Sequence, residues 1–264
     1  MKNKIIIITG ASSGIGRETA KVLAEKGHTV YDFSRRDISL QNINHIKVDV
    51  ANEENVQNAV KKVFDKEGRI DIVINCAGYG ISGAVEFTET KDAQRQFDVN
   101  FFGTVNVNKA VIPYMRKLGA GRIVNISSVA AVAHIPFQTY YSASKAALES
   151  YTNALANEVR PFGITITAIQ PGDICTEFTG ARQKSFDGDD IYDGRISRSV
   201  SGMEKDEVKG MSPIIAAEYI AKISLQKNVK PVYAIGAQYK FLSVLCKVFP
   251  CSFRNRVVGM LYAK

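Results

Sequence analysis

Short apolar runs alternate with segments of helical periodicity along most of the chain. Residues 5–9 form a β-branched run, and the apolar positions of residues 18–26 then recur with helical spacing as far as Gly27. We predict further strands at 29–33, 46–48, 70–75, 123–127 and 164–169, and further helices at 56–68, 98–118 and 140–162. Strands that are apolar throughout and separated by helices are typical of a parallel sheet covered on both faces. We therefore expect an α/β fold in which residues 1–264 form a single doubly wound, Rossmann-like domain.

Two segments depart from this pattern. Residues 176–211 are polar, rich in Gly, Ser and Asp, and weakly periodic, so we expect a mobile insertion of the kind that often closes an active site. Residues 239–264 interleave apolar side chains with five cations and contain no acidic residue; the cations are Lys240, Lys247, Arg254, Arg256 and Lys264. This tail is either an amphipathic flap over a lipid-like substrate or an anionic membrane surface, or a helix packed on the core or on a second subunit. We expect the tail and the insertion to build an apolar substrate pocket together.

The bulk composition narrows the partners. The net charge is +8, but most Lys and Arg are scattered, which favours a solvated basic surface. No compact basic helix or aromatic ladder is present, so we expect no nucleic-acid partner. The four cysteines lack the spacing of a metal site, and no metal is expected. The apolar run 5–8 is too short for a signal peptide, and no stretch is apolar for long enough to span a bilayer, so a cytoplasmic location is expected.

A glycine-rich turn follows the first predicted strand, with the sequence TGASSGIG at positions 9–16. Glycines let the backbone approach a pyrophosphate closely, and a helix N-terminus offers it free N–H groups. Because the turn joins the first strand to the first helix, it favours dinucleotide binding over a plain tight turn. The residues assigned to the cofactor here are Gly10, Ser12, Ser13, Gly14, Ile15 and Gly16.

The end of the second strand indicates which dinucleotide is bound. An acidic residue at this point binds the adenosine ribose and repels a 2′-phosphate. Asp32 favours NAD, but it precedes the end of the strand; Ser34 occupies the usual acidic position and is followed by Arg35 and Arg36. Guanidinium groups match phosphate geometry, so we predict NADP(H), with Arg35 as the main reader and Arg36 or Ser13 as helpers.

A serine, a tyrosine and a lysine supply the candidate chemistry. Tyr141 and Lys145 are four residues apart and therefore share one face of a helix. The ammonium and the nicotinamide charge are expected to lower the tyrosine pKa, making Tyr141 a proton donor or acceptor. A serine that ends the preceding strand can polarise a carbonyl, and both Ser127 and Ser128 are candidates.

Taken together, these residues resemble the short-chain dehydrogenase/reductase family, in the branch with a Thr-Gly-x-x-x-Gly-x-Gly loop. The resemblance extends from residue 4 to about residue 176. Its motifs, in order, are residues 9–16, Asp49, residues 75–78, Asn100, residues 125–128, Tyr141-x-x-x-Lys145 and Pro171-Gly172.

The resemblance implies further roles. It assigns the serine role to Ser128, thirteen residues before Tyr141, and gives Asn100 a helix kink and a bound water that links Lys145 to solvent. Lys145 also contacts the nicotinamide ribose. Residues implied to border the cofactor or to stabilise the sheet beside it are Asp49, Val50, Asn75, Ala77, Gly78, Pro171, Gly172, Ile174 and Thr176. Cys76 departs from the family, which often has Asn there, and this affects local packing only.

The resemblance also suggests a substrate class. Residues 96–103 and 140–163 resemble the subgroup of hydroxysteroid, retinol and acyl-dihydroxyacetone-phosphate reductases, which implies a bulky apolar alcohol or ketone. A homodimer or homotetramer is expected. The alternatives are an NAD(H)-dependent enzyme acting on a small polar or acyl-thioester substrate, and a cofactor-binding module without turnover. The second alternative is disfavoured because Tyr141 and Lys145 are both present.

Overall fold

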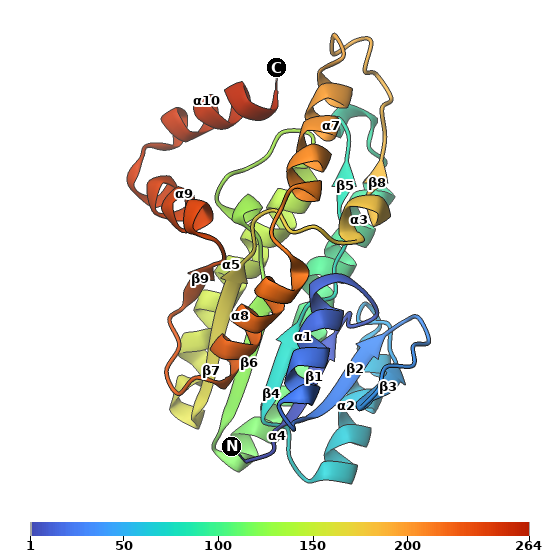
Figure 1. Cartoon of the computed structure of the whole chain (residues 1–264), viewed down its shortest axis with the longest axis vertical. Coiled ribbons are helices and arrows are strands. Elements are labelled where there is room, and N and C mark those ends of the chain that lie inside the picture. Colours follow the sequence, from blue (N-terminus) through green and yellow to red (C-terminus); the bar gives the residue numbers. More distant parts are fainter. Residues whose placement is uncertain (1, 264) are drawn as a thin grey trace.

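Seven parallel strands form the sheet in the computed structural model, which describes residues 2–263 (Figure 1). Their spatial order is β3-β2-β1-β4-β6-β7-β9, the doubly wound arrangement predicted from the apolar runs. The strands are β1 (Ile5–Thr9), β2 (Thr29–Ser34), β3 (Ile43–Lys47), β4 (Ile72–Asn75), β6 (Gly121–Ile126), β7 (Ile164–Gln170) and β9 (Val232–Ala234). The register pairs Ile5 with Thr29 and Ile6 with Ile72, so β1 lies between β2 and β4.

Helices cover both faces of this sheet (Figure 1). Ile5 and Ile7 of β1 pack with α2 (Glu53–Glu67), α4 (Gly103–Leu118) and α5 (Thr139–Val159), whereas Ile6 and Ile8 pack with α1 (Gly14–Glu25) and α8 (Pro213–Leu225). Side chains alternate between the two faces of a strand, so a strand buried on both sides must be apolar throughout. This alternation explains the continuous isoleucine run in β1.

The long helix predicted at 98–118 is interrupted. α3 (Thr90–Phe97) continues into a π-helical turn at Asp98–Phe102 before α4 begins. Short 3-10 turns lie at Val85–Phe87, Val129–Ala131 and Arg160–Phe162. A π-helical turn inside a helix is often associated with a functional site, and this one carries Asn100.

The expectation of a mobile, weakly periodic insertion at 176–211 is wrong in its secondary structure. The segment contains α6 (Phe178–Ala181), β8 (Gln183–Lys184), which pairs with β5 (Ile81–Ser82), and α7 (Arg195–Val208). α7 buries Ile196, Val200 and Met203, which are spaced i, i+4 and i+7. The high content of Gly, Ser and Asp around this stripe concealed its helical period.

The C-terminal tail forms two helices, α9 (Ala237–Val248) and α10 (Cys251–Tyr262), separated at Pro250. Both lie at the end of the molecule that also carries α7, beyond the carboxyl ends of the strands (Figure 1). Tyr262 packs with the buried residues of α7, and Val258 packs with Cys246 and Ala133. Lys264 and the side chain of Lys247 lie outside the described part of the chain. Within residues 2–263, no helix is both long enough and apolar enough to cross a membrane.

Candidate active site

The predicted site residues gather around one cavity of about 600 Å³ at the carboxyl ends of the strands. Ligands of open α/β sheets bind at this end. Every residue assigned to the cofactor from the sequence lines the cavity except Asn75, and Ser128 also contributes to its wall. Residues from the beginning, the middle and the end of the Rossmann-like domain therefore converge on one site.

The glycine loop presents bare backbone to this cavity. Gly10 has a φ of +73°, and a Cβ added to Gly16 would lie 2.5 Å from the carbonyl oxygen of Gly10. Side chains are therefore excluded where the loop turns into α1. A backbone that can be approached so closely, at the N-terminus of a helix, fits the phosphates of a dinucleotide.

The two arginines after β2 lie at one end of the cavity. The Arg36 guanidinium donates hydrogen bonds to Ser12 Oγ and Ser13 Oγ, both at 2.8 Å. Arg36 is thus the arginine that contacts the glycine loop, although Arg35 was expected to be the main reader. Both side chains line the cavity.

Asp32 is buried and turned away from the cavity wall. Its carboxylate accepts hydrogen bonds from the Ala11 N–H at 2.9 Å and the Ser34 hydroxyl at 2.7 Å, and it lies 2.8 Å from His45 Nδ1. These contacts give Asp32 a structural role within the sheet. They explain why it lies before the end of the strand rather than at the position that faces the cavity.

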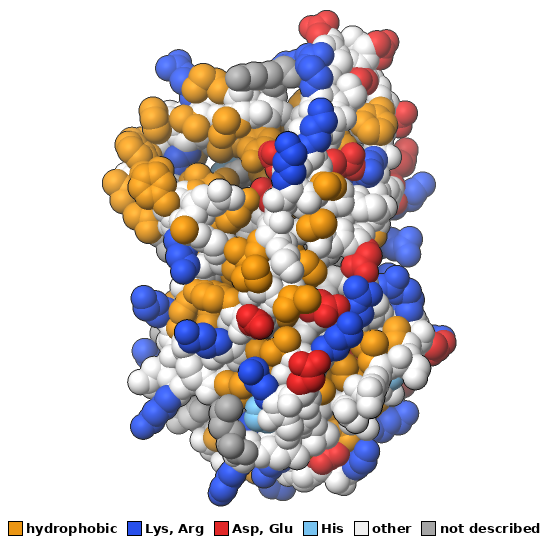
Figure 2. Space-filling view, viewed as in Figure 1, with side chains coloured by type: hydrophobic (Ala, Val, Ile, Leu, Met, Phe, Trp, Pro, Cys, Tyr) orange, Lys and Arg blue, Asp and Glu red, His pale blue; other side chains and the backbone are white. Residues whose placement is uncertain are grey.

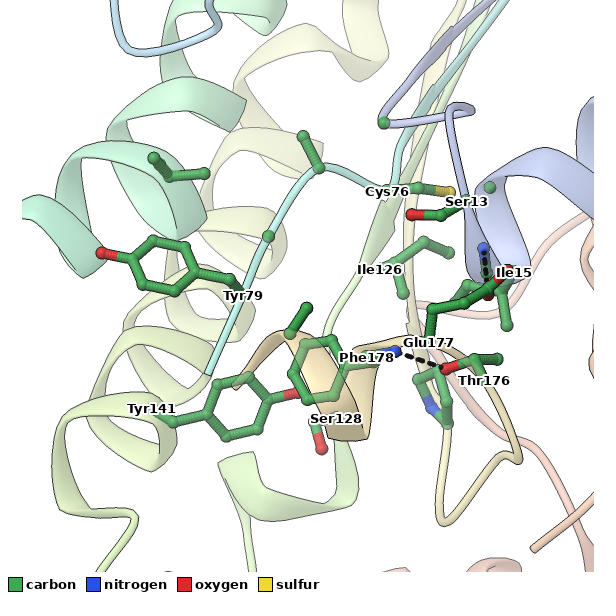
Figure 3. Close-up of a pocket in the computed structure, with 18 of the residues that line it drawn as sticks. Ser13, Ile15, Cys76, Tyr79, Ile126, Ser128, Tyr141, Thr176, Glu177 and Phe178 are labelled. Carbon is green, nitrogen blue, oxygen red and sulfur yellow. Dashed lines mark hydrogen bonds between the residues drawn. The ribbon is translucent and has the colours of Figure 1, made fainter. Parts of the chain in front are cut away.

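Ser128 and Tyr141 meet on the wall of the cavity (Figure 3), and Lys145 lines the same cavity. The hydroxyl groups of Ser128 and Tyr141 share a hydrogen bond. The Lys145 Nζ donates to the carbonyl oxygen of Ile126 at 2.8 Å and lies 5.8 Å from the centre of the Tyr141 ring. Ser127 instead donates to the Lys145 carbonyl oxygen at 3.3 Å. The geometry therefore brings Ser128, and not Ser127, to the phenol.

Burial opposes the expected lowering of the Tyr141 pKa. Burial raises the pKa of Tyr141 to about 12, and the hydrogen bond with Ser128 only partly offsets this effect. Burial lowers the pKa of Lys145 to about 8. Removing a charged group from water disfavours its charged form, which is phenolate for tyrosine and ammonium for lysine. Tyr141 is therefore a protonated phenol at neutral pH.

Asn100 lies behind this wall and holds the chain at Tyr79. Its Oδ1 accepts from the Tyr79 N–H at 3.0 Å, and its Nδ2 donates to the Tyr79 carbonyl oxygen at 2.9 Å. A Cβ added to Gly78 would lie 3.1 Å from Asn100 Oδ1 and 3.7 Å from Lys145 Nζ. Asn100 and Lys145 thus both lie next to Gly78, and Asn100 is in a π-helical turn where a kink was expected.

Asn75 is buried beneath the cavity rather than in its wall. Its Nδ2 donates to Asn108 Oδ1 at 2.9 Å and to Asn125 Oδ1 at 2.8 Å. These bonds tie β4 to β6 and α4, so the expected contact of Asn75 with the cofactor is corrected to a sheet-stabilising role. Thr9 was quoted only as part of a motif, yet its hydroxyl accepts from the N–H groups of Cys76 and Ala77 at 3.1 and 3.0 Å.

The segment after β7 closes the other side of the cavity (Figure 3). The Pro171 carbonyl oxygen accepts from the Val129 N–H at 3.0 Å, which fixes this segment beside Ser128. The Phe178 N–H donates to Thr176 Oγ1 at 3.2 Å, and the Phe178 ring lies 5.8 Å from the ring of Tyr141. The first turn of the insertion therefore lies against the catalytic tyrosine.

Six residues that line this wall were not predicted from the sequence: Asp173, Glu177, Phe178, Ala181, Gln183 and Glu207. Glu177 accepts a hydrogen bond from the Gly14 N–H at 3.1 Å and lies 2.8 Å from an Arg17 guanidinium nitrogen. Glu207 pairs with Arg182. Asp173 had a detectable signal, since it directly follows the Pro171-Gly172 motif and is the one charged residue between Pro171 and Thr176. Glu207 had none, because it reaches the site through the fold of α7.

Comparisons with known proteins agree with this geometry. A family model described as short chain dehydrogenase matches residues 4–186. A 3-ketodihydrosphingosine reductase of Bacteroides thetaiotaomicron is 45% identical over 231 residues, covering 86% of each chain. The solved structure of a short-chain dehydrogenase from Streptomyces avermitilis has a TM-score of 0.85 at 29% identity and covers 98% of this chain and 96% of its own. The structure of ElxO with NADP bound has a TM-score of 0.76 at 28% identity and covers 90% and 99%.

Proposed function

The chain belongs to the short-chain dehydrogenase/reductase family of oxidoreductases, and on that premise we propose that it uses NADPH to reduce the ketone of a long-chain lipid resembling 3-ketodihydrosphingosine. The observation that carries the proposal is the meeting of Ser128, a protonated Tyr141 and Lys145 on the wall of a cavity that has Arg35 and Arg36 at its far end.

The arginine pair supports NADPH over NADH. Arg35 and Arg36 line the end of the cavity next to Ser12 and Ser13, where a 2′-phosphate would find guanidinium and hydroxyl donors. Asp32, the residue that would favour NADH, has its carboxylate occupied by hydrogen bonds inside the protein. The NADP bound to ElxO is consistent with this preference.

The protonation state of Tyr141 supports the direction of reduction. NADPH supplies a hydride to the carbonyl carbon when bound. The electron pair of the C=O π bond moves to oxygen, and this oxygen takes the proton from Tyr141 Oη. Ser128 hydrogen-bonds the carbonyl oxygen and stabilises its negative charge as it develops. When the Lys145 amine is protonated, its positive charge offsets the negative charge left on Tyr141.

Two features support a long-chain substrate. Phe178, Ile135 and Val129 contribute apolar surface near Tyr141. A second cavity of about 620 Å³ lies between the tail and α7; its wall includes Met211, Tyr239, Leu242 and Tyr262, and it shares Asp173 with the first cavity. A lipid with its ketone beside Tyr141 could extend its chain in this direction. The 3-ketodihydrosphingosine reductase from Bacteroides thetaiotaomicron has such a substrate by name.

A matched cofactor and substrate assay tests the proposal. Purified protein is mixed with NADPH or NADH and with 3-ketodihydrosphingosine, a steroid ketone, retinal, an acetoacetyl thioester or a ketose, and cofactor oxidation is followed. We expect kcat/KM to be highest for NADPH with the long-chain ketone. A preference for NADH would overturn the cofactor assignment, and a preference for the thioester or the sugar would overturn the substrate class.

A further inference from the structure

An acidic side chain lies on the catalytic wall where an apolar substrate alone would not require one. Asp173 lines the same cavity as Ser128 and Tyr141. It directly follows Gly172, in the segment that the Val129 N–H bond holds beside Ser128. The electrostatic effect of Asp173 reaches the Tyr141 hydroxyl, because its negative charge contributes to raising the pKa of that phenol.

The carboxylate is held firmly from the C-terminal tail. Tyr239 Oη donates a hydrogen bond to Asp173 Oδ2 at 2.5 Å. The Tyr239 ring lies against Gly172, where an added Cβ would be only 2.1 Å from the ring. The backbone is fixed as well, since the Asp173 carbonyl oxygen accepts from the Met211 N–H at 3.0 Å. One hydrogen bond therefore holds the carboxylate and two neighbouring contacts hold the backbone, and a side chain positioned in this way is suited to recognition.

Asp173 forms no ion pair with a described lysine, arginine or histidine, whereas the nearby Glu207 is paired with Arg182. Burial raises the pKa of Asp173, and the negative charges of Glu207 and Asp206 add to this effect, whereas the hydrogen bond from Tyr239 and the more distant charge of Arg182 oppose it. A partly desolvated carboxylate that has a hydrogen bond but no ion-pair partner costs free energy, and a cationic ligand would reduce this cost.

Charged side chains lie at both ends of the pocket. Arg35 and Arg36 lie at the cofactor end, and Asp173 lies at the substrate end, where the two cavities meet. If an amphiphile binds with its ketone at Tyr141, the boundary between its polar head and its apolar chain would lie at this junction. A negative charge here disfavours acyl thioesters and carboxylates and favours a head group that carries a cation.

We propose that Asp173 is a specificity-determining residue that binds the ammonium group of an α-amino ketone, adjacent to the carbonyl addressed by Tyr141 and Ser128. The inference rests on the proposed function and narrows its substrate to long-chain amino ketones. In such a ketone the nitrogen is attached to the carbon next to the carbonyl, so one head group presents both the oxygen and the cation. An ammonium bound to Asp173 also brings positive charge toward the oxygen that receives the proton.

The test compares 3-ketodihydrosphingosine with the same ketone lacking the amine, in the wild type and in Asp173→Asn. A hydrogen bond to a charged group predicts that Asp173→Asn lowers kcat/KM for the amino ketone by about tenfold to a hundredfold. Loss of the Asp173 charge acts on Tyr141 equally with both ketones, so the ratio of kcat/KM for the amino ketone to that for the deaminated ketone should fall by this factor, and activity on the deaminated ketone shows that the variant is folded. The matched control is Asp206→Asn, which removes an exposed carboxylate beside the second cavity but outside the catalytic one.

Two outcomes overturn the inference. An equal loss on both ketones would make Asp173 a structural residue, and no loss on the amino ketone would exclude ammonium binding. If the variant does not fold, the wild type alone tests the inference. An N-acetylated amino ketone is neutral, so its kcat/KM should be lower than that of the amine by the same factor as the kcat/KM of the deaminated ketone. Equal rates with all three ketones would refute the role of charge.

A binding measurement separates this inference from the proposed function. Dihydrosphingosine, which carries the amine, and a fatty alcohol of equal length are titrated into protein saturated with NADP⁺. We expect Asp173→Asn to weaken binding of the amine about tenfold or more and to leave the alcohol unchanged. If the wild type reduces neither ketone, the proposed reductase activity fails. The titration still tests Asp173, because equal affinities of the wild type and the variant for the amine would refute ammonium binding by this residue.

Discussion

Tyr141 and Lys145 are four positions apart on α5, yet burial moves their pKa values in opposite directions. The phenol remains protonated across the physiological range, whereas the lysine titrates within it, with a pKa of about 8. Tyr141 therefore supplies the proton, and the titration of Lys145 determines how the activity depends on pH.

Replacing Tyr141 with Phe should remove most of the turnover. General acid catalysis contributes about 10²–10⁴-fold, so kcat for ketone reduction should fall by at least about a hundredfold. NADPH binding, followed by fluorescence, should persist because the ring is retained. Tyr140→Phe, a neighbouring tyrosine outside the cavity wall, is the control. A near-normal kcat in Tyr141→Phe would rule this phenol out as the proton donor.

The Lys145 titration predicts a pH profile. Below about pH 8 the ammonium is present and supports proton donation by Tyr141; above it, the charge is lost and kcat for reduction should fall. The phenol does not cause this fall, since its pKa of about 12 lies higher. Lys145→Arg keeps the charge, so its profile should be flat between pH 7 and 10, at whatever rate it retains. A wild-type rate that stays constant up to pH 9.5 contradicts the assignment.

The arginines after β2 can be tested by single substitution. Arg36→Ala, which loses the bonds to Ser12 and Ser13, and Arg35→Ala should each raise KM for NADPH by about tenfold or more and leave NADH kinetics unchanged. Arg116→Ala, whose side chain lies over Phe162 and outside the cavity wall, is the control. Equal effects on both cofactors would mean that the arginines organise the glycine loop and do not read a phosphate.

At the scale of elements, α7 shows where sequence analysis succeeds and where it stops. Strands such as β1 and β4 could be predicted because buried apolar residues dominate them, and Tyr141-x-x-x-Lys145 because its spacing matches one helical turn. The sequence does contain the helical spacing of Ile196, Val200 and Met203, but the polar residues between these positions made the period hard to recognise. The bond between Tyr239 and Asp173 was not detectable, because it joins residues 66 positions apart and depends on how the tail folds back.

The stripe of α7 predicts a stability effect that local composition would not. Ile196→Ala should lower the free energy of unfolding by about 2–5 kcal/mol, since it leaves a cavity among packed side chains. It should also raise KM for the long-chain ketone, because α7 carries part of the pocket wall. Ile191→Ala, in the same segment but 67% exposed, should change little in denaturant titrations. Equal effects of the two substitutions would show that α7 is not docked as described.

At the scale of the whole molecule, the tail leaves an apolar surface uncovered (Figure 2). Phe241, Val244 and Val248 on α9 are 66%, 58% and 73% exposed, although the opposite side of the helix packs inward. A patch of this kind usually marks an interaction site. The tail also carries cations and no acidic residue, which is the composition expected of a surface that rests on an anionic membrane.

This surface predicts salt-sensitive binding to vesicles. Wild-type protein should sediment with phosphatidylglycerol vesicles more than with phosphatidylcholine vesicles, and Phe241→Glu with Val248→Glu should abolish the difference. Ile191→Glu, which introduces the same charge on exposed apolar surface elsewhere, is the control. If the double variant instead changes the mass of the particle in solution, the patch joins two copies of the chain.

The contact between Glu177 and the glycine loop has a kinetic consequence. The carboxylate accepts from the first N–H of α1, at the helix end that attracts anions, and therefore competes with any phosphate there. Arrival of the dinucleotide would free the start of the 176–211 segment, which also carries Phe178 beside Tyr141. Such a contact imposes a compulsory order of addition, with NADPH first and the ketone second. Product inhibition by NADP⁺ should then be competitive against NADPH and mixed against the ketone. The Glu177→Gln variant should bind NADPH more tightly, and the order of addition should no longer be compulsory in it.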